Sequence, residues 1–313
     1  MARIDVHHHI APPSWVAALH RRVAGPLLGW SVERSLRDMD RAGVKTAIVS
    51  ITTPGVGASA DGLGGHVARA CNEYAASLVA DFPGRFGFFA AVPLPDIDDS
   101  LAEIEYAFEH LGADGVCLFT SYDTQWLGHA AFDPVLAELD RRAAVVYTHP
   151  TASPSCRSVL PGIKDAIIEY GADTTRAIAN LIISRIPDRF PNVAWIFSHG
   201  GGVLPMVHER LLRVVESEHG LSRRSTEAQL KQFFYDIAQV ANPIAMSALS
   251  RMTQPSQLLW GTDFPYRSAE EYVHQLSDAG FSSSDQRLIE TKNALRLLPH
   301  SGDPSRRRPA LCS

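Results

Sequence analysis

The residues best suited to chemistry begin near the N-terminus, in the stretch Ile4-Asp5-Val6-His7-His8-His9. Side chains alternate between the two faces of a strand, so His7 and His9 point the same way and His8 points the opposite way. Two imidazoles side by side at the end of a strand supply half of a metal site. The other half is expected at the ends of later strands.

Three more polar residues each follow a short β-rich run. They are His149 after residues 145–148, His199 after residues 193–198 and Asp263 after residues 258–262. Imidazoles combined with a carboxylate suit Zn²⁺, Mn²⁺, Fe²⁺ or Co²⁺, and a catalytic site keeps a position open for water or substrate. Two-metal barrel sites of this type often use a bridging lysine at the end of the fourth strand, and residues 114–118 contain none. One divalent ion, Zn or Mn, is therefore expected.

Short apolar runs alternate with helical segments along the chain. Strands are expected at residues 3–7, 44–52, 86–92, 115–119, 144–148, 193–198, 233–237 and 257–261. Apolar strands separated by helices are typical of a parallel sheet buried on both faces. Eight such units favour a (β/α)8 TIM barrel, whose active site lies at the C-terminal ends of the strands, where all five polar residues fall. The alternative is an open doubly wound sheet, but no GxGxxG follows the first strand.

Composition narrows the class of protein further. The chain has 313 residues, of which 45% are hydrophobic and 20% charged, with a net charge of −5. We expect one barrel domain over residues 1–299 and a mobile tail over residues 300–313, which lack periodic apolar residues. No basic face indicates nucleic acid, and no apolar run reaches the roughly 18 residues of a membrane span. Without a secretion signal, and with four cysteines in no paired motif, a cytoplasmic location is expected.

Four motifs resemble those of the amidohydrolase superfamily. They are IDVHHH at residues 4–9, THP at 148–150, SHGGG at 198–202 and GTDFP at 261–265. The resemblance is greatest to the decarboxylase branch, which includes aminocarboxymuconate-semialdehyde, γ-resorcylate and 6-methylsalicylate decarboxylases, and it covers about residues 3–299. It implies a barrel of the metal-dependent hydrolase type and a homodimer or higher homo-oligomer. The metal ligands that it implies are His7, His9, His149 and Asp263, with His199 as an acid/base rather than a ligand.

The same resemblance bears on the substrate. In the aminocarboxymuconate-semialdehyde enzyme, an arginine eleven residues after the HGGG histidine enters the partner subunit's site and binds a substrate carboxylate, and Arg210 has that spacing. A surface or intersubunit salt bridge is the alternative role for Arg210. A second arginine of that enzyme lies between the first two strands, and residues 25–32 contain none. A small aromatic monoacid is therefore expected instead of a dicarboxylate. Residues 10–13 and 53–57 are similar to 6-methylsalicylate decarboxylases.

Non-oxidative decarboxylation of an ortho-hydroxy aromatic acid is the first functional hypothesis. Protonating the ipso carbon before carbon dioxide leaves avoids a ring carbanion, and Asp263, or His199 through it, would deliver the proton. The metal would grip the carboxylate and phenolic oxygens together as a Lewis acid. Trp126, Phe264 and Tyr266 are candidates to flank the substrate ring, with core packing as their alternative role.

Two other hypotheses use the same residues. A metal-dependent hydrolase of a lactone, an amide or a carbon–carbon bond would attack with metal-activated water, and His199 or Asp263 would take the proton. A non-catalytic scaffold that keeps an inactive barrel would be expected to have lost one of the five polar residues. All five are present in the chain.

Overall fold

The computed structural model describes residues 2–19, 23–57, 63–299 and 301. Its main sheet has eight strands, and each hydrogen-bonded pair of neighbours is parallel. In sheet order they are β1 (Arg3–His9), β2 (Val44–Ser50), β3 (Phe86–Ala91), β4 (Gly115–Phe119), β7 (Val145–His149), β8 (Ala194–Phe197), β9 (Phe234–Asp236) and β10 (Leu258–Leu259). All eight overlap the strands predicted from the sequence.

Backbone hydrogen bonds join the first strand to the last and close the sheet. The N–H of Val6 donates to the carbonyl of Trp260 over 3.0 Å, and the N–H of Asp263 donates to the carbonyl of His7 over 2.8 Å. A parallel bridge between His8 and Phe264 continues the contact. The predicted (β/α)8 barrel is confirmed, and the open doubly wound sheet is excluded. These bonds bring the C-terminal ends of β1 and β10, where the motif residues lie, side by side.

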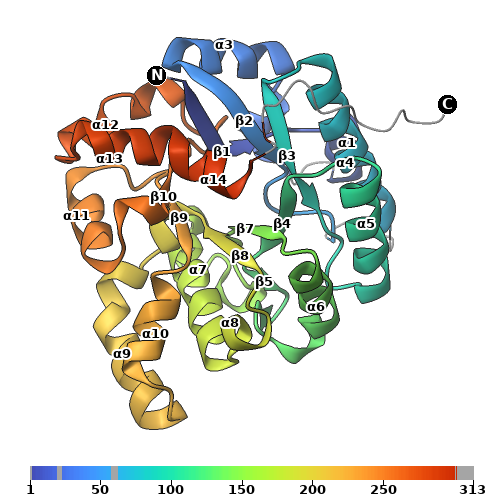
Figure 1. Cartoon of the computed structure of the whole chain (residues 1–313). Coiled ribbons are helices and arrows are strands. Elements are labelled where there is room, and N and C mark those ends of the chain that lie inside the picture. Colours follow the sequence, from blue (N-terminus) through green and yellow to red (C-terminus); the bar gives the residue numbers. More distant parts are fainter. Residues whose placement is uncertain (1, 20–22, 58–62, 300, 302–313) are drawn as a thin grey trace.

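Helices surround the strands (Figure 1). The longer ones are α1 (Pro13–Leu19), α3 (Val32–Ala42), α4 (Gly64–Asp81), α5 (Ile97–Glu109), α6 (Asp133–Arg141), α7 (Asp165–Ile183), α9 (Leu204–His219), α10 (Arg223–Leu230) and α11 (Pro243–Met252). Shorter ones are α2 (Gly25–Leu28), α8 (Ile186–Arg189), α12 (Gln275–Asp278), α13 (Ser283–Arg287) and α14 (Asn293–Leu297). The helix predicted at residues 32–42 has these bounds because Ser31 caps its N-terminus and Gly43, at φ 67°, ends it.

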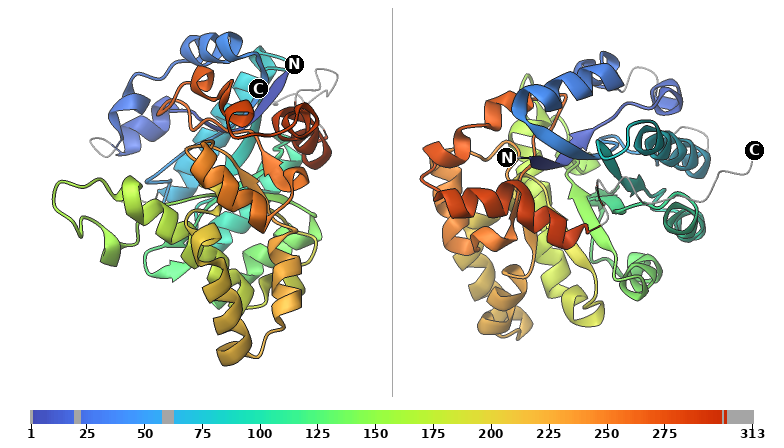
Figure 2. Two further views of the ribbon diagram at one scale, coloured as in Figure 1. Left: turned by 90° about the vertical axis from the view of Figure 1, so that its left-hand side faces the viewer. Right: turned by 45° about the horizontal axis from the view of Figure 1, so that its top comes forward.

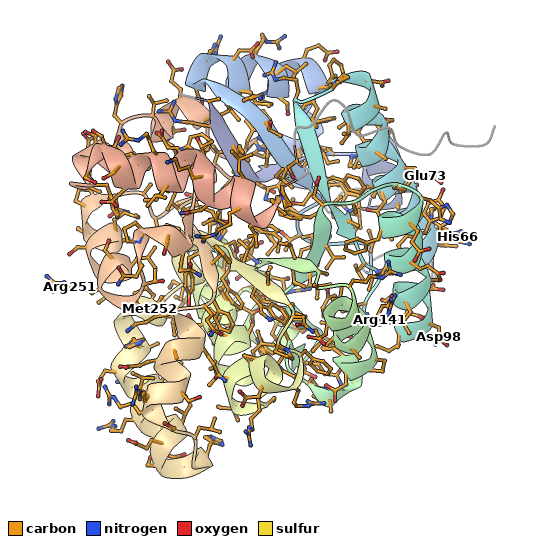
Figure 3. The ribbon with its side chains drawn as sticks, viewed as in Figure 1. His66, Glu73, Asp98, Arg141, Arg251 and Met252 are labelled. Carbon is orange, nitrogen blue, oxygen red and sulfur yellow. The ribbon has the colours of Figure 1, made fainter. Side chains whose placement is uncertain are left out.

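Charged side chains lie on the outside of this ring of helices, and apolar side chains fill the inside of the barrel. The exposed charged residues labelled in Figure 3 lie at the rim of the molecule, on the outer helices. They are Glu73, Asp98, Arg141 and Arg251. Inside the barrel, Ile4, Val6 and Tyr147 belong to a buried cluster to which most of the eight strands contribute. The interior is therefore a packed core, and the space for chemistry lies above it, at the C-terminal ends of the strands.

One feature of the structure was not predicted, and one prediction falls outside the described residues. A small antiparallel hairpin, β5 (Ser121–Tyr122) with β6 (Gln125–Trp126), follows β4 and was not predicted. The expected tail at residues 300–313 lies outside the described residues, apart from Ser301. Within the described part of the chain, the helices are too short or too polar to cross a membrane.

Candidate metal centre

Four buried side chains meet above the barrel core. One potential ligand atom from each of His7, His9, His149 and Asp263 lies within 4.8 Å of the others. The Nε2 atoms of His7 and His9 are 3.1 Å apart, and Oδ1 of Asp263 lies 3.3 Å from the first and 3.2 Å from the second. Residues from β1, β7 and the segment after β10 thus converge at one point, as the spacing of the motifs predicted.

A β-bulge in β1 lets His7 and His9 face the inside of the barrel. Asp5 pairs with Ala47 but His8 pairs with Val49, so β1 holds one more residue than β2 over this stretch. Strict alternation from the buried core residue Val6 would send His7 to the outer face, whereas the extra residue lets both Val6 and His7 face the interior. His8 points outward and lies 2.8 Å from Oγ of Ser35 on α3. The prediction that His7 and His9 share a face opposite to His8 is confirmed.

Hydrogen bonds fix the Nδ1 atoms of two of the imidazoles. Nδ1 of His149 lies 2.8 Å from the carbonyl oxygen of Pro150, and Nδ1 of His7 lies 2.8 Å from Oδ2 of Asp236. Both oxygens accept, so Nδ1 donates in each case, and in the neutral ring Nε2 then carries the lone pair. Metal-binding histidines usually have such a partner on the second nitrogen, because it fixes both the tautomer and the ring orientation.

The electrostatics of this cluster favour positive charge at its centre. Burial lowers the pKa of His9 to about 4 and that of His149 well below its usual value, so both rings are neutral. Burial also opposes the charged form of His7, but Asp236 and Asp263 outweigh it and raise its pKa to about 10. Burial favours a neutral Asp263, yet His7 and His199 hold its pKa well below the usual range.

Asp263 also has an unsatisfied oxygen. Oδ1 is buried, faces Nε2 of both His7 and His9, and has no hydrogen-bond partner. A buried anionic oxygen without a partner is costly, and a cation at the centre of these ligands would remove that cost. The residues present therefore fit a divalent metal ion.

His199 lies beside the cluster. Its Nε2 is 3.6 Å from Oδ2 of Asp263, the oxygen turned away from His7 and His9, and this nitrogen is buried without a hydrogen bond. Its backbone is left-handed, at φ 52°. The glycines that follow it allow a close turn, since a Cβ on Gly202 would lie 2.1 Å from the carbonyl oxygen of Gly171. The turn thus places an imidazole next to the carboxylate of Asp263.

Aromatic rings surround the histidines of the cluster. The ring of Tyr266 lies 6.2 Å from that of His9, while the rings of Tyr170 and Phe119 lie 6.4 Å and 6.0 Å from that of His149. The Tyr170 hydroxyl is 3.1 Å from Oγ1 of Thr53. The side chains are flat and mostly apolar, with a few hydroxyls, which suits a small aromatic ligand.

The other substrate-binding candidates occupy different places. Trp126 donates from Nε1 to Oδ1 of the buried Asp173 over 2.6 Å, which ties the β5–β6 hairpin to α7. Phe264 is buried and stacks on His8, with ring centroids 4.5 Å apart, on the face of β1 opposite to His7 and His9. Arg210 is exposed on α9. Of these candidates, Tyr266 is the one whose ring contacts a histidine of the cluster.

Three residues that brace the centre were not singled out from the sequence. Asp5 accepts hydrogen bonds from the backbone N–H groups of His7 and Thr262, over 3.0 Å and 3.1 Å, where the barrel closes. Asp236 contacts His7, and Gln239 donates to Oδ2 of Asp263 over 2.8 Å. Asp236 ends β9, so the rule that polar residues at strand ends build the site could have identified it, whereas Asp5 lies in the middle of β1 and is marked only by its place in the first motif. Gln239 lies in a loop, and its sequence neighbourhood carries no comparable signal.

Comparisons with known proteins agree with this geometry. A 6-methylsalicylic acid decarboxylase of Penicillium expansum is 36% identical over 314 residues, covering 96% of this chain and 97% of that protein. Decarboxylase yanB of Aspergillus niger is 37% identical, covering 97% and 89%. A dihydroxybenzoic acid decarboxylase of Polaromonas sp., solved with manganese and 2-nitroresorcinol, has the same fold, with a TM-score of 0.83, 22% identity and coverage of 96% and 97%. The family model described as amidohydrolase matches residues 4–300. The chain belongs to the amidohydrolase family.

Proposed function

We propose that this protein is a metal-dependent, non-oxidative decarboxylase of a small ortho-hydroxy aromatic acid similar to 6-methylsalicylate. The main support is the buried cluster of His7, His9, His149 and Asp263, with His199 against the outer oxygen of Asp263. This cluster lies in a chain that aligns over 96% of its length with a decarboxylase of 6-methylsalicylic acid. Zn or Mn is the proposed ion, and the manganese-bound Polaromonas structure favours Mn.

The reaction needs a proton at the ring carbon that bears the carboxylate. His7, His9, His149 and Asp263 would hold a divalent ion, which would supply Lewis-acid chemistry toward the carboxylate and phenolic oxygens of the substrate. Asp263 holds its Oδ1 toward His7 and His9 and its Oδ2 toward His199, so its two oxygens have separate tasks. His199 gives its proton through Oδ2 of Asp263 to the ipso carbon. The carbon–carbon bond then breaks, its electron pair restores the aromatic ring, and carbon dioxide leaves.

The low pKa of Asp263 explains why two residues share the proton transfer. Burial alone would raise that pKa, but His7 and His199 lower it by more than burial raises it. The carboxylate is therefore ionised near neutral pH. An ionised carboxylate relays a proton only if an adjacent acid supplies one. The Nε2 of His199 is the nearest imidazole nitrogen to Oδ2 that stands outside the ligand cluster.

Incubation of the Mn- or Zn-loaded protein with 6-methylsalicylate is expected to release carbon dioxide and 3-methylphenol. In deuterated water, the product should carry one deuterium at the carbon that lost the carboxylate, because that carbon takes its proton from an exchangeable group. Mass spectrometry and NMR measure both outcomes, and a chelator should abolish them. As a control, 2-methylbenzoate lacks the ortho-hydroxyl and should remain unchanged. Hydrolysis of lactones or amides, with no hydroxybenzoate decarboxylated, would contradict the proposal.

We also propose that the protein is a homodimer in which Arg210 enters the partner's site. The segment between β7 and α7 stands out from the barrel in the left-hand view of Figure 2. Large apolar side chains are exposed on this segment, on the first turns of α7 and at the start of α9. They are Val159, Leu160, Ile163, Ile167, Ile168, Val203 and Met206. The N–H of Val203 donates to the carbonyl of Gly171 over 3.3 Å, so α7 and α9 adjoin there. This apolar surface, together with Arg210 on α9, is the proposed interface.

Met206→Glu is expected to convert the dimer to monomers, because it places a charge in the proposed interface. Ile244→Glu is the matched control, since both residues lie in the first turn of a helix and are 79% and 86% exposed. The control should remain dimeric. Sedimentation velocity measures the mass of each variant. A dimeric Met206→Glu protein, or a wild-type monomer, would contradict this interface.

A cytoplasmic location is the accompanying proposal. Cys71 and Cys117 are buried, and these two and Cys156 are free thiols. Burial raises the pKa of the Cys71 thiol, which keeps it protonated and unreactive. Free thiols are typical of a reducing compartment.

A further inference from the structure

Asp236 is a fully buried carboxylate that contacts the metal centre from outside the ligand cluster. It ends β9, and its exposed fraction is 0%. Oδ2 lies 2.8 Å from Nδ1 of His7. Oδ1 accepts hydrogen bonds from the backbone N–H groups of His199, over 2.9 Å, and Ala238, over 3.0 Å. One side chain therefore touches both an inferred metal ligand and the backbone of the inferred acid/base.

The contact with His7 decides which nitrogen of that imidazole faces the cluster. A carboxylate has no proton to donate, so the atom that faces it must be Nδ1–H. In the neutral ring, Nε2 then carries the lone pair, and Nε2 lies 3.1 Å from Nε2 of His9 and 3.3 Å from Oδ1 of Asp263. Without a fixed acceptor at Nδ1, the ring could carry its proton on Nε2, where it would block metal binding.

The contact with His199 fixes a backbone conformation that side-chain-bearing residues seldom adopt. His199 has φ 52°, in the left-handed region. The hydrogen bond from its N–H to Oδ1 of Asp236 holds this turn, and the second bond from Ala238 keeps Oδ1 in place. The direction of the His199 ring follows from this backbone, and with it the 3.6 Å approach of Nε2 to Oδ2 of Asp263.

We infer that Asp236 is a positioning residue that sets the tautomer of His7 and the orientation of His199. The inference rests on the proposed metal-dependent function. A carboxylate that served only to satisfy backbone N–H groups would need Oδ1 alone. Here Oδ2 is directed at the imidazole of His7, in the arrangement by which carboxylates orient metal-binding histidines.

Asp236→Asn separates positioning from shape. The amide has the size of the carboxylate, so a purely structural role predicts a mild effect. If the amide oxygen still accepts from His199 and Ala238, the NH₂ group faces Nδ1 of His7 and forces the proton of that ring onto Nε2. If the amide turns over, its NH₂ group opposes two backbone N–H donors. Either arrangement disturbs the centre, so Asn should be at least as harmful as Ala.

The test is the dissociation constant for Mn²⁺ or Zn²⁺, measured by competition with a chromophoric chelator. Asp236→Asn is expected to weaken binding about 10- to 100-fold, the range typical when the partner of a metal-binding histidine is lost. Asp236→Ala should weaken it by the same amount or less. Glu103→Gln is the control, because it also replaces a buried carboxylate by an amide. Glu103 lies on α5, away from the metal centre, and contacts Arg69 and Asn72 of α4. The control should bind the metal as the wild type does.

Wild-type metal affinity in a folded Asp236→Asn protein, with weaker binding in Asp236→Ala, would overturn the inference. Should the Asn variant not fold, Asp236→Glu decides, because it keeps the charge and an acceptor. Glu must then bind the metal about tenfold more tightly than Ala, and equal affinities would overturn the inference. If the wild type binds metal but decarboxylates none of the hydroxybenzoates, the proposed function fails while the affinity series still tests Asp236.

Discussion

His199→Ala is expected to keep one metal ion per chain while turnover of the aromatic acid falls by about 10²- to 10⁴-fold, the range that general acid–base catalysis contributes. The metal should remain because His199 stands outside the cluster of His7, His9, His149 and Asp263. Turnover should fall because Nε2 of His199 is the nitrogen that faces Oδ2 of Asp263. Metal analysis of the purified protein and initial rates with 6-methylsalicylate measure the two effects separately.

The left-handed backbone at His199 calls for a second variant. Alanine at φ 52° is strained, so a loss in His199→Ala could arise from a changed turn. Asparagine tolerates this region and keeps a polar side chain, but it has no titratable ring. His199→Asn should therefore retain the turn and still lose turnover to a similar extent. Turnover like that of the wild type in His199→Asn would exclude His199 as the proton donor.

The site could be predicted from polar residues at the ends of apolar runs, because parallel strands place their C-terminal ends on one face of a barrel. His149 and Asp263 lie far apart in the sequence, yet His149 ends β7 and Asp263 follows β10. The family resemblance is confirmed by the match over residues 4–300. The eight strands were predictable for the same reason, since short apolar runs between helices have few other solutions.

Other parts of the site depend on details that no periodic pattern encodes. The bulge in β1 adds one residue between Asp5 and His8, and alternation alone could not show that Val6 and His7 both face inward. The β5–β6 hairpin has strands of only two residues, too short for a period. Gln239 reaches Asp263 from a loop at φ 62°, and that conformation depends on tertiary contacts such as the bond from its N–H to the Tyr272 hydroxyl.

His149→Ala is expected to lose both bound metal and turnover, and it has the largest predicted effect on the metal centre. The substitution removes one of four ligands, and it leaves Oγ1 of Thr52 and the carbonyl of Pro150 without their contacts to the ring. Metal content after dialysis should fall toward zero, and decarboxylation should fall with it. Full metal content with normal turnover would contradict the ligand assignment.

His8→Ala is the matched control. His8 is as buried as the ligands and lies between His7 and His9 in the sequence, but its ring is on the opposite face of β1. Its ring contacts Oδ2 of Asp5 over 3.1 Å and Oγ of Ser35 over 2.8 Å. Losing these contacts should lower the free energy of unfolding by about 1–3 kcal/mol, measured by urea denaturation, while one metal ion per chain remains. The two variants together separate the metal from the fold. If His149→Ala loses metal and His8→Ala loses stability, the two faces of β1 have the different roles that its bulge assigns them.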